Sequence, residues 1–355
     1  MVAHGQKIIA LTDLHDSIKE TSGLIYLNHK LITHNDSGGD PALYEIDSIS
    51  GRILRTVFIE NATNIDWEDI CYDSTYVYIG DFGNDGSRTD LKIYRLPILS
   101  YFNTPNDTVS VDTINFSYSD QRDFTPNQFA TNFDAEALIA YNESLYIFTK
   151  NWGDNWTNIY ALPKTPGTYQ ISRLDSIDAG GLVTGATYNA SSHTVLLTGY
   201  TFDSAFIIDI SDLTENGFSS GIVRRYQIST PPDYSFQIEG IASLGINQYY
   251  LSAEELGSLK PALYRLDADV TSVLKLNEEH PVHFYPNPAA DVVNVYLNDL
   301  SRIEIYDMHG ILRKTATEKQ ICVSDLNKGM YLINIKTTSG KNAVFPILII
   351  EGQGH

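Results

Sequence analysis

The chain has 355 residues, of which 43% are hydrophobic and 11% aromatic, so it can bury one large core or two of ordinary size. Its formal net charge of −20 repels phosphate backbones and anionic lipid surfaces, which makes nucleic acids and membranes poor partners. No aliphatic run approaches the roughly 20 residues that a transmembrane helix requires. The composition therefore favours a folded protein whose partners are cations or neutral or cationic ligands.

The N-terminus, MVAHGQKIIALTDL, lacks the apolar core of a signal peptide. We therefore expect that the protein is cytosolic or that its signal peptide is missing from this sequence. The chain has two cysteines, Cys71 and Cys322, which lie far apart and in different predicted domains. Each is expected to be a free, buried thiol.

Five segments of the chain align without gaps, and each comprises a short apolar strand, a polar turn and a second, alternating strand. They are ETSGLIYLNHKLITHNDSGG from Glu20, DWEDICYDSTYVYIGDFGND from Asp66, DAEALIAYNESLYIFTKNWG from Asp134, VTGATYNASSHTVLLTGYTF from Val183 and QIEGIASLGINQYYLSAEEL from Gln237. A third strand follows each segment, and a fourth follows all but the last. The N-terminal stretch KIIALTDL can supply the missing strand.

Repeats of four antiparallel strands are typical of a β-propeller, in which each blade needs neighbours to bury its faces. We predict an all-β fold with a five-bladed propeller over residues 1–270, closed by the N-terminal strand. A six-bladed ring is the alternative, and it would need an extra blade between the second and third segments.

The first two strands of each repeat place acidic residues at one mouth of the predicted channel. The second strand runs back along the first, so the start of one and the end of the other lie on the same face. The residues expected to hold a metal ion are Asp66, Glu68, Asp134, Glu136 and Glu239. The residues expected to contact a ligand are Glu20, His34, Asp36, Asp81, Lys150, Trp152 and Glu254. The fourth segment, with Val183 and Gly185, interrupts this acidic ring.

These carboxylates have two interpretations. In the structural one, a carboxylate at the start of a strand accepts backbone N–H groups of neighbouring blades and holds the ring together. In the other, crowded carboxylates bind a hard cation, most simply calcium, which takes six to eight oxygen ligands. His34 is either a hydrogen-bonded turn residue or a base or ligand at this mouth.

Two classes of function remain open. The sequence lacks a Gly-x-Ser-x-Gly elbow, a His-Glu-x-x-His motif and a phosphate-binding glycine loop. The first class is a protein that binds an extracellular ligand at the acidic mouth, with calcium as support. The second is a metal-assisted hydrolase such as a phosphoesterase. Because Lys150 is the only basic residue expected there, the sequence favours binding.

A second domain is predicted after the repeats. Residues 271–281 read as a linker, and residues 282–355 carry short strands and turns that predict a small, immunoglobulin-like β-sandwich. This domain resembles the type A C-terminal sorting domain of the type IX secretion system of Bacteroidota. The resemblance rests on Tyr285, Pro286, Asn287, Pro288, Gly310, Gly329, Met330 and Tyr331. It implies Sec export to the periplasm and passage through the outer membrane by that machinery, usually with removal of the sorting domain and release or attachment at the cell surface.

The first domain resembles secreted phytase-like and related calcium-dependent propellers. The resemblance rests on the short acidic elements DWED, DAEA and IEGI, which open three of the inner strands. It implies a bound calcium ion and, in the phytase-like case, phosphoesterase activity.

Overall fold

The computed structural model describes residues 7–202, 204–213, 217–231, 233–267, 283–297, 299–307, 311–338 and 342–350. The chain divides into two compact units, Met1–Ala268 and Asp269–His355. The predicted linker, 271–281, and the predicted sorting residue Gly310 lie outside the described residues. No helix among the described residues is long and apolar enough to cross a bilayer.

The first unit contains five antiparallel sheets, each of four main strands. The first comprises β2 (Thr21–Leu27), β3 (Lys30–Asn35), β4 (Ala42–Ile46) and β5 (Ile53–Ile59). The second comprises β6 (Trp67–Tyr72), β7 (Tyr76–Asp81), β8 (Lys92–Pro97) and β10 (Asp112–Tyr118). The third comprises β11 (Ala135–Tyr141), β12 (Ser144–Thr149), β13 (Trp156–Pro163) and β15 (Arg173–Asp178).

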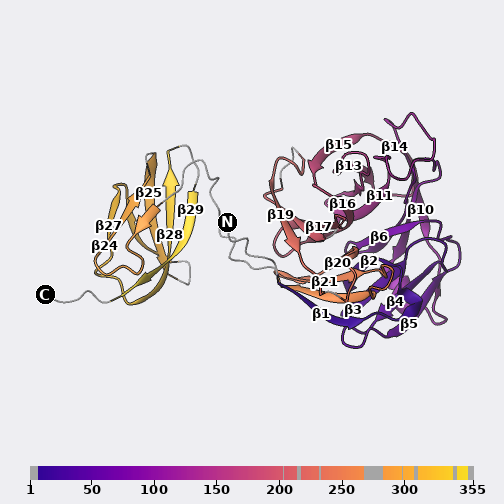
Figure 1. The fold of residues 1–355 in the computed structure, drawn as a ribbon, viewed down its shortest axis with the longest axis horizontal. Helices are drawn as coiled ribbons and strands as arrows, with labels where there is room; N and C mark the ends of the chain where they lie inside the picture. Colours follow the sequence, from indigo (N-terminus) through magenta and orange to yellow (C-terminus); the bar gives the residue numbers. More distant parts are fainter. Residues whose placement is uncertain are drawn as a thin grey trace. The chain divides into compact units, whose positions relative to one another are not determined.

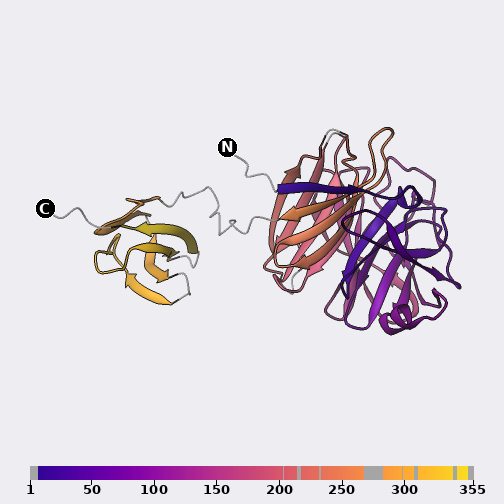
Figure 2. The ribbon, with the colours of Figure 1, turned by 90° about the horizontal axis from the view of Figure 1, so that it is seen from below.

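The last two sheets repeat this arrangement. The fourth comprises β16 (Leu182–Asn189), β17 (Thr194–Tyr200), β18 (Ala205–Ser211) and β19 (Ile222–Ile228). The fifth comprises β20 (Ile238–Gly245), β21 (Gln248–Ala253), β22 (Ala262–Asp267) and, at its outer edge, β1 (Lys7–Asp13). The antiparallel pairing of β1 with β22 confirms the predicted role of the N-terminal strand, and Figure 2 shows the indigo β1 beside the orange strands of this sheet.

Two short strands cover outer edges of the first two sheets. The strand β9 (Thr108–Val109) pairs in parallel with β5, and β14 (Gly167–Ile171) pairs in parallel with β10. Each therefore links a sheet to the segment that follows it in the chain and hides backbone groups that an open edge would expose. The described helices of this unit are the short η1 (Asp16–Ile18) and α1 (Ile98–Asn103).

The five sheets stand in a β-propeller-like ring. The first strands β2, β6, β11, β16 and β20 contact one another in cyclic order and surround the centre (Figure 1). Apolar clusters fill the space between neighbouring sheets, and one of them joins Leu24 of the first sheet to Leu263 of the last. Because the last sheet packs on the first, every inner strand has a neighbour on both sides.

A register shift occurs near the start of every inner strand. In the third sheet it lies between Ala135 and Ala137, and in the fifth between Ile238 and Gly240, so Glu136 and Glu239 occupy bulges. The second sheet has its shift between Trp67 and Ile70. A bulge re-aims side chains away from the regular alternation of a strand. The same irregularity therefore recurs where the acidic residues lie.

The second unit has two sheets around one core. Its strands are β23 (His283–Tyr285), β24 (Val292–Tyr296), β25 (Leu300–Asp307), β26 (Leu312–Ala316), β27 (Gln320–Cys322), β28 (Gly329–Thr337) and β29 (Asn342–Ile349). Cys71 is a buried free thiol, as predicted, but Cys322 is exposed. The prediction for Cys322 was wrong because Ile321 faces the core, and successive side chains of a strand point to opposite faces.

Candidate functional site

A polar cavity of about 360 Å³ opens at the end of the ring where the inner strands begin. We call it the acidic mouth. Its lining residues come from all five sheets and the loops between them: Ser22, Asp36, Ser37, Asp66, Glu68, Asn84, Asp85, Gln128, Asp134, Glu136, Lys150, Trp152, Tyr200, Gln237, Glu239 and Glu254. Eight of these side chains are carboxylates, and Lys150 is the single basic residue in the lining. The cavity is therefore strongly electronegative.

The structure gathers most of the predicted site residues in this lining. All five residues expected to hold a metal ion are present, namely Asp66, Glu68, Asp134, Glu136 and Glu239. Four of the expected ligand residues join them, namely Asp36, Lys150, Trp152 and Glu254. The convergence follows from the hairpin geometry, because each inner strand starts where its partner strand ends.

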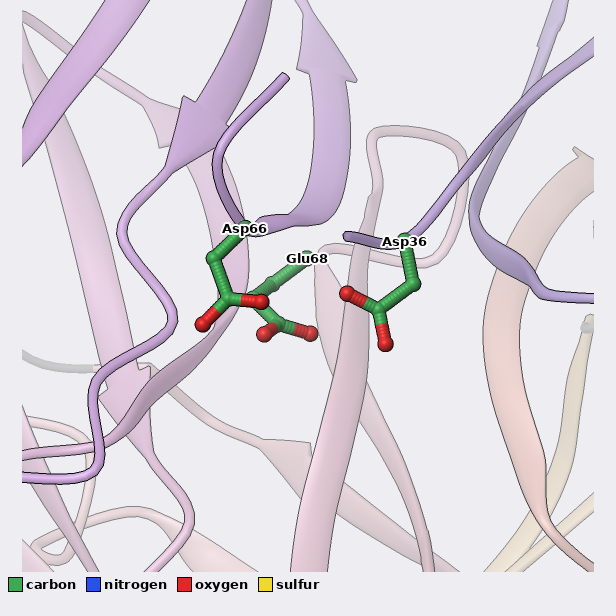
Figure 3. Close-up of side chains that lie close together, drawn as sticks. All are labelled: Asp36, Asp66 and Glu68. Atoms are coloured by element: carbon green, nitrogen blue, oxygen red, sulfur yellow. The ribbon is translucent and has the colours of Figure 1, made fainter. Parts of the chain in front are cut away.

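Glu68 lies at the centre of the carboxylates. One group consists of Asp36, Asp66 and Glu68, and another of Glu68, Asp134 and Glu136. Within each group, carboxylate oxygens lie within 4.8 Å of one another. Figure 3 shows the side chains of the first group turned toward a common point. Glu68 belongs to both groups, so an ion bound in either one would contact it.

Glu68 is buried beside other carboxylates. It is 6% exposed, and within the described residues its carboxylate has neither an ion pair nor a hydrogen-bond donor. Burial, followed by the neighbouring carboxylates of Glu136 and Asp36, raises the pKa of Glu68 well above its usual value. A Cβ at Gly83 would clash with the carboxylates of Glu68 and Asp66, so the glycine leaves room for these two side chains. Glu68 nevertheless lines the acidic mouth.

The other carboxylates of the mouth are crowded as well. Burial and neighbouring negative charges raise the pKa of Asp36 to about 8, that of Asp66 to about 6 and that of Glu254 to about 8. Burial is the largest cause in all three. Burial also raises the pKa of Asp134, although it accepts hydrogen bonds from the backbone N–H of Asn84 at 2.7 Å and from Nε1 of Trp152 at 3.0 Å. Without a cation, the close approach of several of these carboxylates therefore costs the folded state free energy.

Lys150 provides local compensation on one side. Its Nζ lies 3.1 Å from Oε1 of Glu136 and 5.4 Å from the ring centroids of Trp152 and Tyr200. Burial opposes its protonation, but the neighbouring carboxylates, Glu136 first, hold the pKa of Lys150 well above its usual value. One ammonium group balances one carboxylate, which leaves the Glu68 side of the cavity uncompensated.

Three residues expected at the mouth lie outside its lining. Asp81 is fully buried, where Arg88 and Lys92 neutralise it at 2.9 Å and 3.5 Å. Asp81 was expected to contact a ligand, but it forms structural ion pairs instead. Glu20 is exposed to solvent on the segment that precedes β2.

His34 likewise takes the structural role rather than that of a base or ligand at the mouth. Its Nδ1 donates to the carbonyl of Asn35 at 3.0 Å, and its ring packs edge-on against Trp67 with centroids 5.6 Å apart. Burial lowers the pKa of His34 to about 4, so the imidazole is neutral at physiological pH.

Asp69 was not among the predicted site residues. It takes the structural role that was considered for the other carboxylates, in which a carboxylate accepts backbone N–H groups of neighbouring blades. Asp69 is fully buried and accepts backbone hydrogen bonds from Leu138 on β11 at 2.8 Å and from Ala186 on β16 at 3.1 Å. It therefore joins the second sheet to the third and the fourth. Its only sequence signal is its position beside Glu68 in the element WEDI.

Tyr200 was also missed. It occupies the same position in its segment as Glu254 does in the fifth segment, and this equivalence was the available signal. Thr184 of the fourth sheet lies in the register shift between Val183 and Gly185; it is fully buried and donates to the carbonyl of Ile238 at 2.6 Å. The interruption of the acidic ring at the fourth segment thus places neutral side chains on that side.

Residues 283–350 match the family described as the secretion system C-terminal sorting domain. This part of the chain belongs to that family. The predicted sorting domain is confirmed, and it identifies the protein as one that is secreted or displayed at the cell surface. Among the predicted motif residues, Gly329 and Tyr331 lie on β28, with Tyr331 packed into the core of this unit.

The sequence is also similar to Beta-agarase D from Zobellia galactanivorans (strain DSM 12802). The two are 32% identical over 103 residues, which is 28% of this chain and 20% of the relative. The match thus spans about a fifth of the length of that protein.

Several solved structures are similar in fold. The exo-beta-1,3-galactanase from Phanerochaete chrysosporium is 9% identical with a TM-score of 0.47, covering 96% of this chain and 90% of that one. The PQQ-bound aldose sugar dehydrogenase from Streptomyces coelicolor is 10% identical with a TM-score of 0.43, covering 74% and 98%. The GH43_1 enzyme from Xanthomonas citri is 10% identical with a TM-score of 0.42, covering 74% and 90%. The activities in these names belong to those proteins.

Proposed function

We propose that this secreted protein is a closed, five-bladed propeller that binds calcium at the acidic mouth and holds an extracellular ligand against the bound ion. The small second unit is then an immunoglobulin-like sandwich that serves export. The observation that carries the proposal is Glu68, a buried carboxylate that has no hydrogen-bond or ion-pair partner in the described part of the chain and is shared by two groups of converging carboxylates.

The donor set favours calcium among the biological cations. The lining offers carboxylate, amide and hydroxyl oxygens, and neither histidine nor cysteine is among the lining residues. Hard cations prefer oxygen ligands, and calcium accepts irregular sets of six to eight, whereas zinc favours nitrogen and sulfur. A cation at Glu68 would also offset the repulsion that, after burial, raises the pKa values of Asp36 and Asp66.

The cavity also has groups that would hold an organic ligand beside the ion. Trp152 and Tyr200 supply aromatic surface, and Gln128 and Gln237 supply amide groups. A small number of polar groups near aromatic walls is typical of ligand-binding cavities. We therefore place the ligand over these side chains, in contact with the free coordination positions of the calcium ion.

A metal-assisted hydrolase is the second candidate, and Lys150 is the observation that favours it. A buried ammonium group beside a cation would stabilise negative charge that develops on a substrate oxygen. Binding ranks first because Lys150 is already paired with Glu136 and the lining contains no second basic group. Assays of phosphate-ester and glycoside hydrolysis with calcium and with chelator separate the two candidates. Turnover that depends on calcium and is lost in Lys150→Met would establish the hydrolase.

Thermal unfolding tests the calcium site. A ligand that binds only the folded state stabilises it by about 2.7 kcal/mol at a hundredfold excess over its dissociation constant. We expect the melting temperature of the wild type to rise with calcium and fall with EGTA. Glu68→Gln should lose most of this response, because it removes the charge of the carboxylate common to both groups.

The matched control is Glu143→Gln, which removes one glutamate charge at the opposite end of the same ring and should keep the full calcium response. If chelator leaves the melting temperature of the wild type unchanged, or if both variants lose the response equally, calcium does not bind at Glu68.

A further inference from the structure

A second cavity, of about 770 Å³, opens at the opposite end of the ring. Residues from the far ends of all five inner strands line it, so it lies on the same axis as the acidic mouth. Three tyrosines, Tyr26, Tyr72 and Tyr188, belong to its lining, and we call it the tyrosine mouth. Its volume lies within the range of about 300 to 1,000 Å³ that is usual for small-molecule sites.

The inner lining of this cavity is apolar. Ile70, Ile139 and Ala186 line it and are almost fully buried. Asp69 precedes Ile70 and bonds to the backbone of Ala186, so it sits beside this inner end and is itself fully buried. Glu68, one position earlier on β6, already lines the acidic mouth. The two cavities are therefore separate sites.

The outer part presents aromatic rings together with free hydroxyl groups. Tyr72 is 38% exposed, and its hydroxyl donates to the carbonyl of Tyr26 at 3.0 Å, which holds the ring in place. Within the described residues, the side-chain hydroxyls of Thr187, Ser243 and Tyr26 have no hydrogen-bond partner. Such groups are available to a ligand that carries hydroxyls of its own.

Charge at this end is nearly balanced. Lys164 pairs with Asp73 at 3.0 Å, and Glu143 is the one further charged residue in the lining. A cation or an anion would find no concentrated opposite charge here, in contrast to the eight carboxylates of the acidic mouth. A purely apolar ligand would cover the hydroxyl groups of Thr187 and Ser243 without replacing their bonds to water, which costs free energy.

We propose that the tyrosine mouth binds a neutral saccharide. The carbon-bound hydrogens of a sugar ring form an apolar face that packs on the ring of Tyr72, and its hydroxyls bond to Thr187, Ser243 and Tyr26. The tyrosine mouth is distinct from the calcium site, and saccharide binding there does not require calcium.

Isothermal titration calorimetry of the full chain tests this proposal. The probes are four neutral tetrasaccharides of β-linked glucose, galactose, mannose or xylose, each up to roughly 10 mM, in the presence of EGTA. At least one should bind, and its affinity should change less than about twofold between low and high salt because the ligand is uncharged. Tyr72→Ala should weaken this binding about tenfold, whereas Tyr72→Phe should retain it, because the ring supplies the contact.

Phe202→Ala is the aromatic control, since Phe202 is fully exposed and lies outside both linings. It should leave saccharide binding unchanged, and melting temperatures of all variants establish that they fold. The proposal is overturned if none of the four tetrasaccharides binds, or if Tyr72→Ala binds as tightly as the wild type. It is also overturned if the apolar dye ANS binds in a Tyr72-dependent manner while no saccharide does.

Discussion

The two ends of the ring differ in chemistry although the same strands build both. On β6, Glu68 lines the acidic mouth, Ile70 lines the tyrosine mouth, and Asp69 between them bonds to the backbones of β11 and β16. Two adjacent carboxylates thus have opposite roles. Asp69 has its donors within the fold, whereas Glu68 has none among the described residues and lines the acidic mouth. Burial alone therefore does not distinguish a structural carboxylate from one that binds a ligand. The hydrogen-bond donors around the carboxylate make that distinction.

Substitution of Asp69 should produce the largest effect. Asp69→Ala leaves the buried N–H groups of Leu138 and Ala186 without an acceptor, and each such loss costs about 1 to 3 kcal/mol. We expect the free energy of unfolding to fall by about 3 kcal/mol or more, measured by urea denaturation. Asp69→Asn keeps an oxygen acceptor and should lose less. A loss within about 0.5 kcal/mol for Asp69→Ala would remove the distinction between Asp69 and Glu68.

The pH dependence of stability should come mainly from the acidic mouth. In the folded state the pKa of Asp66 is about 6 and those of Asp36 and Glu254 are about 8, above their ordinary values near 4. Between those limits the folded protein binds more protons than the unfolded chain, so the free energy of unfolding falls as pH rises from about 4 to 8.

This decrease in the free energy of unfolding should be clear in EGTA and much smaller with saturating calcium. Bound calcium then neutralises the carboxylates in place of the protons. Urea denaturation at pH 5 and pH 8, with and without calcium, measures it. Stability that rises over this interval in EGTA would contradict the assignment of uncompensated carboxylates to this end of the ring.

Substitution of Lys150 should produce the smallest effect. It tests the difference between the Lys150 side and the Glu68 side of the acidic mouth. Its ammonium group repels a bound divalent ion, so Lys150→Met should tighten calcium binding roughly fivefold, equivalent to about 1 kcal/mol. Calorimetric titration with calcium measures the change. Weaker calcium binding in this variant would indicate that Lys150 supports the site through its contact with Glu136 rather than opposing the ion.

Much of the fold follows from the sequence because the repeats carry it. Alternating apolar residues and recurrent hairpin turns predicted the strands, and the absence of a fourth strand in the last repeat predicted the pairing of β1 with β22. Convergence of the carboxylates followed from the antiparallel geometry of β6 and β7 and of their counterparts.

The remaining features depend on the bulges. A register shift between Trp67 and Ile70 disrupts the regular alternation, so the sequence placed Glu68 at the mouth but did not show that Asp69 bonds to neighbouring strands. The same effect misplaced His34, which is skipped in the pairing between Thr21 and Leu24 and packs against Trp67. The neutralisation of Asp81 was missed because Arg88 reaches it from a loop whose path no periodic pattern describes.

The central claim is that a divalent cation binds at Glu68, and a crystal structure of the protein with calcium tests it most directly. We predict an anomalous difference peak in the acidic mouth, with oxygens at about 2.3 to 2.6 Å that include the carboxylate of Glu68 and those of Asp36 and Asp66 or of Asp134 and Glu136. A cavity that contains only water at saturating calcium, with the Glu68 carboxyl hydrogen-bonded to a neighbouring carboxylate, would contradict the claim.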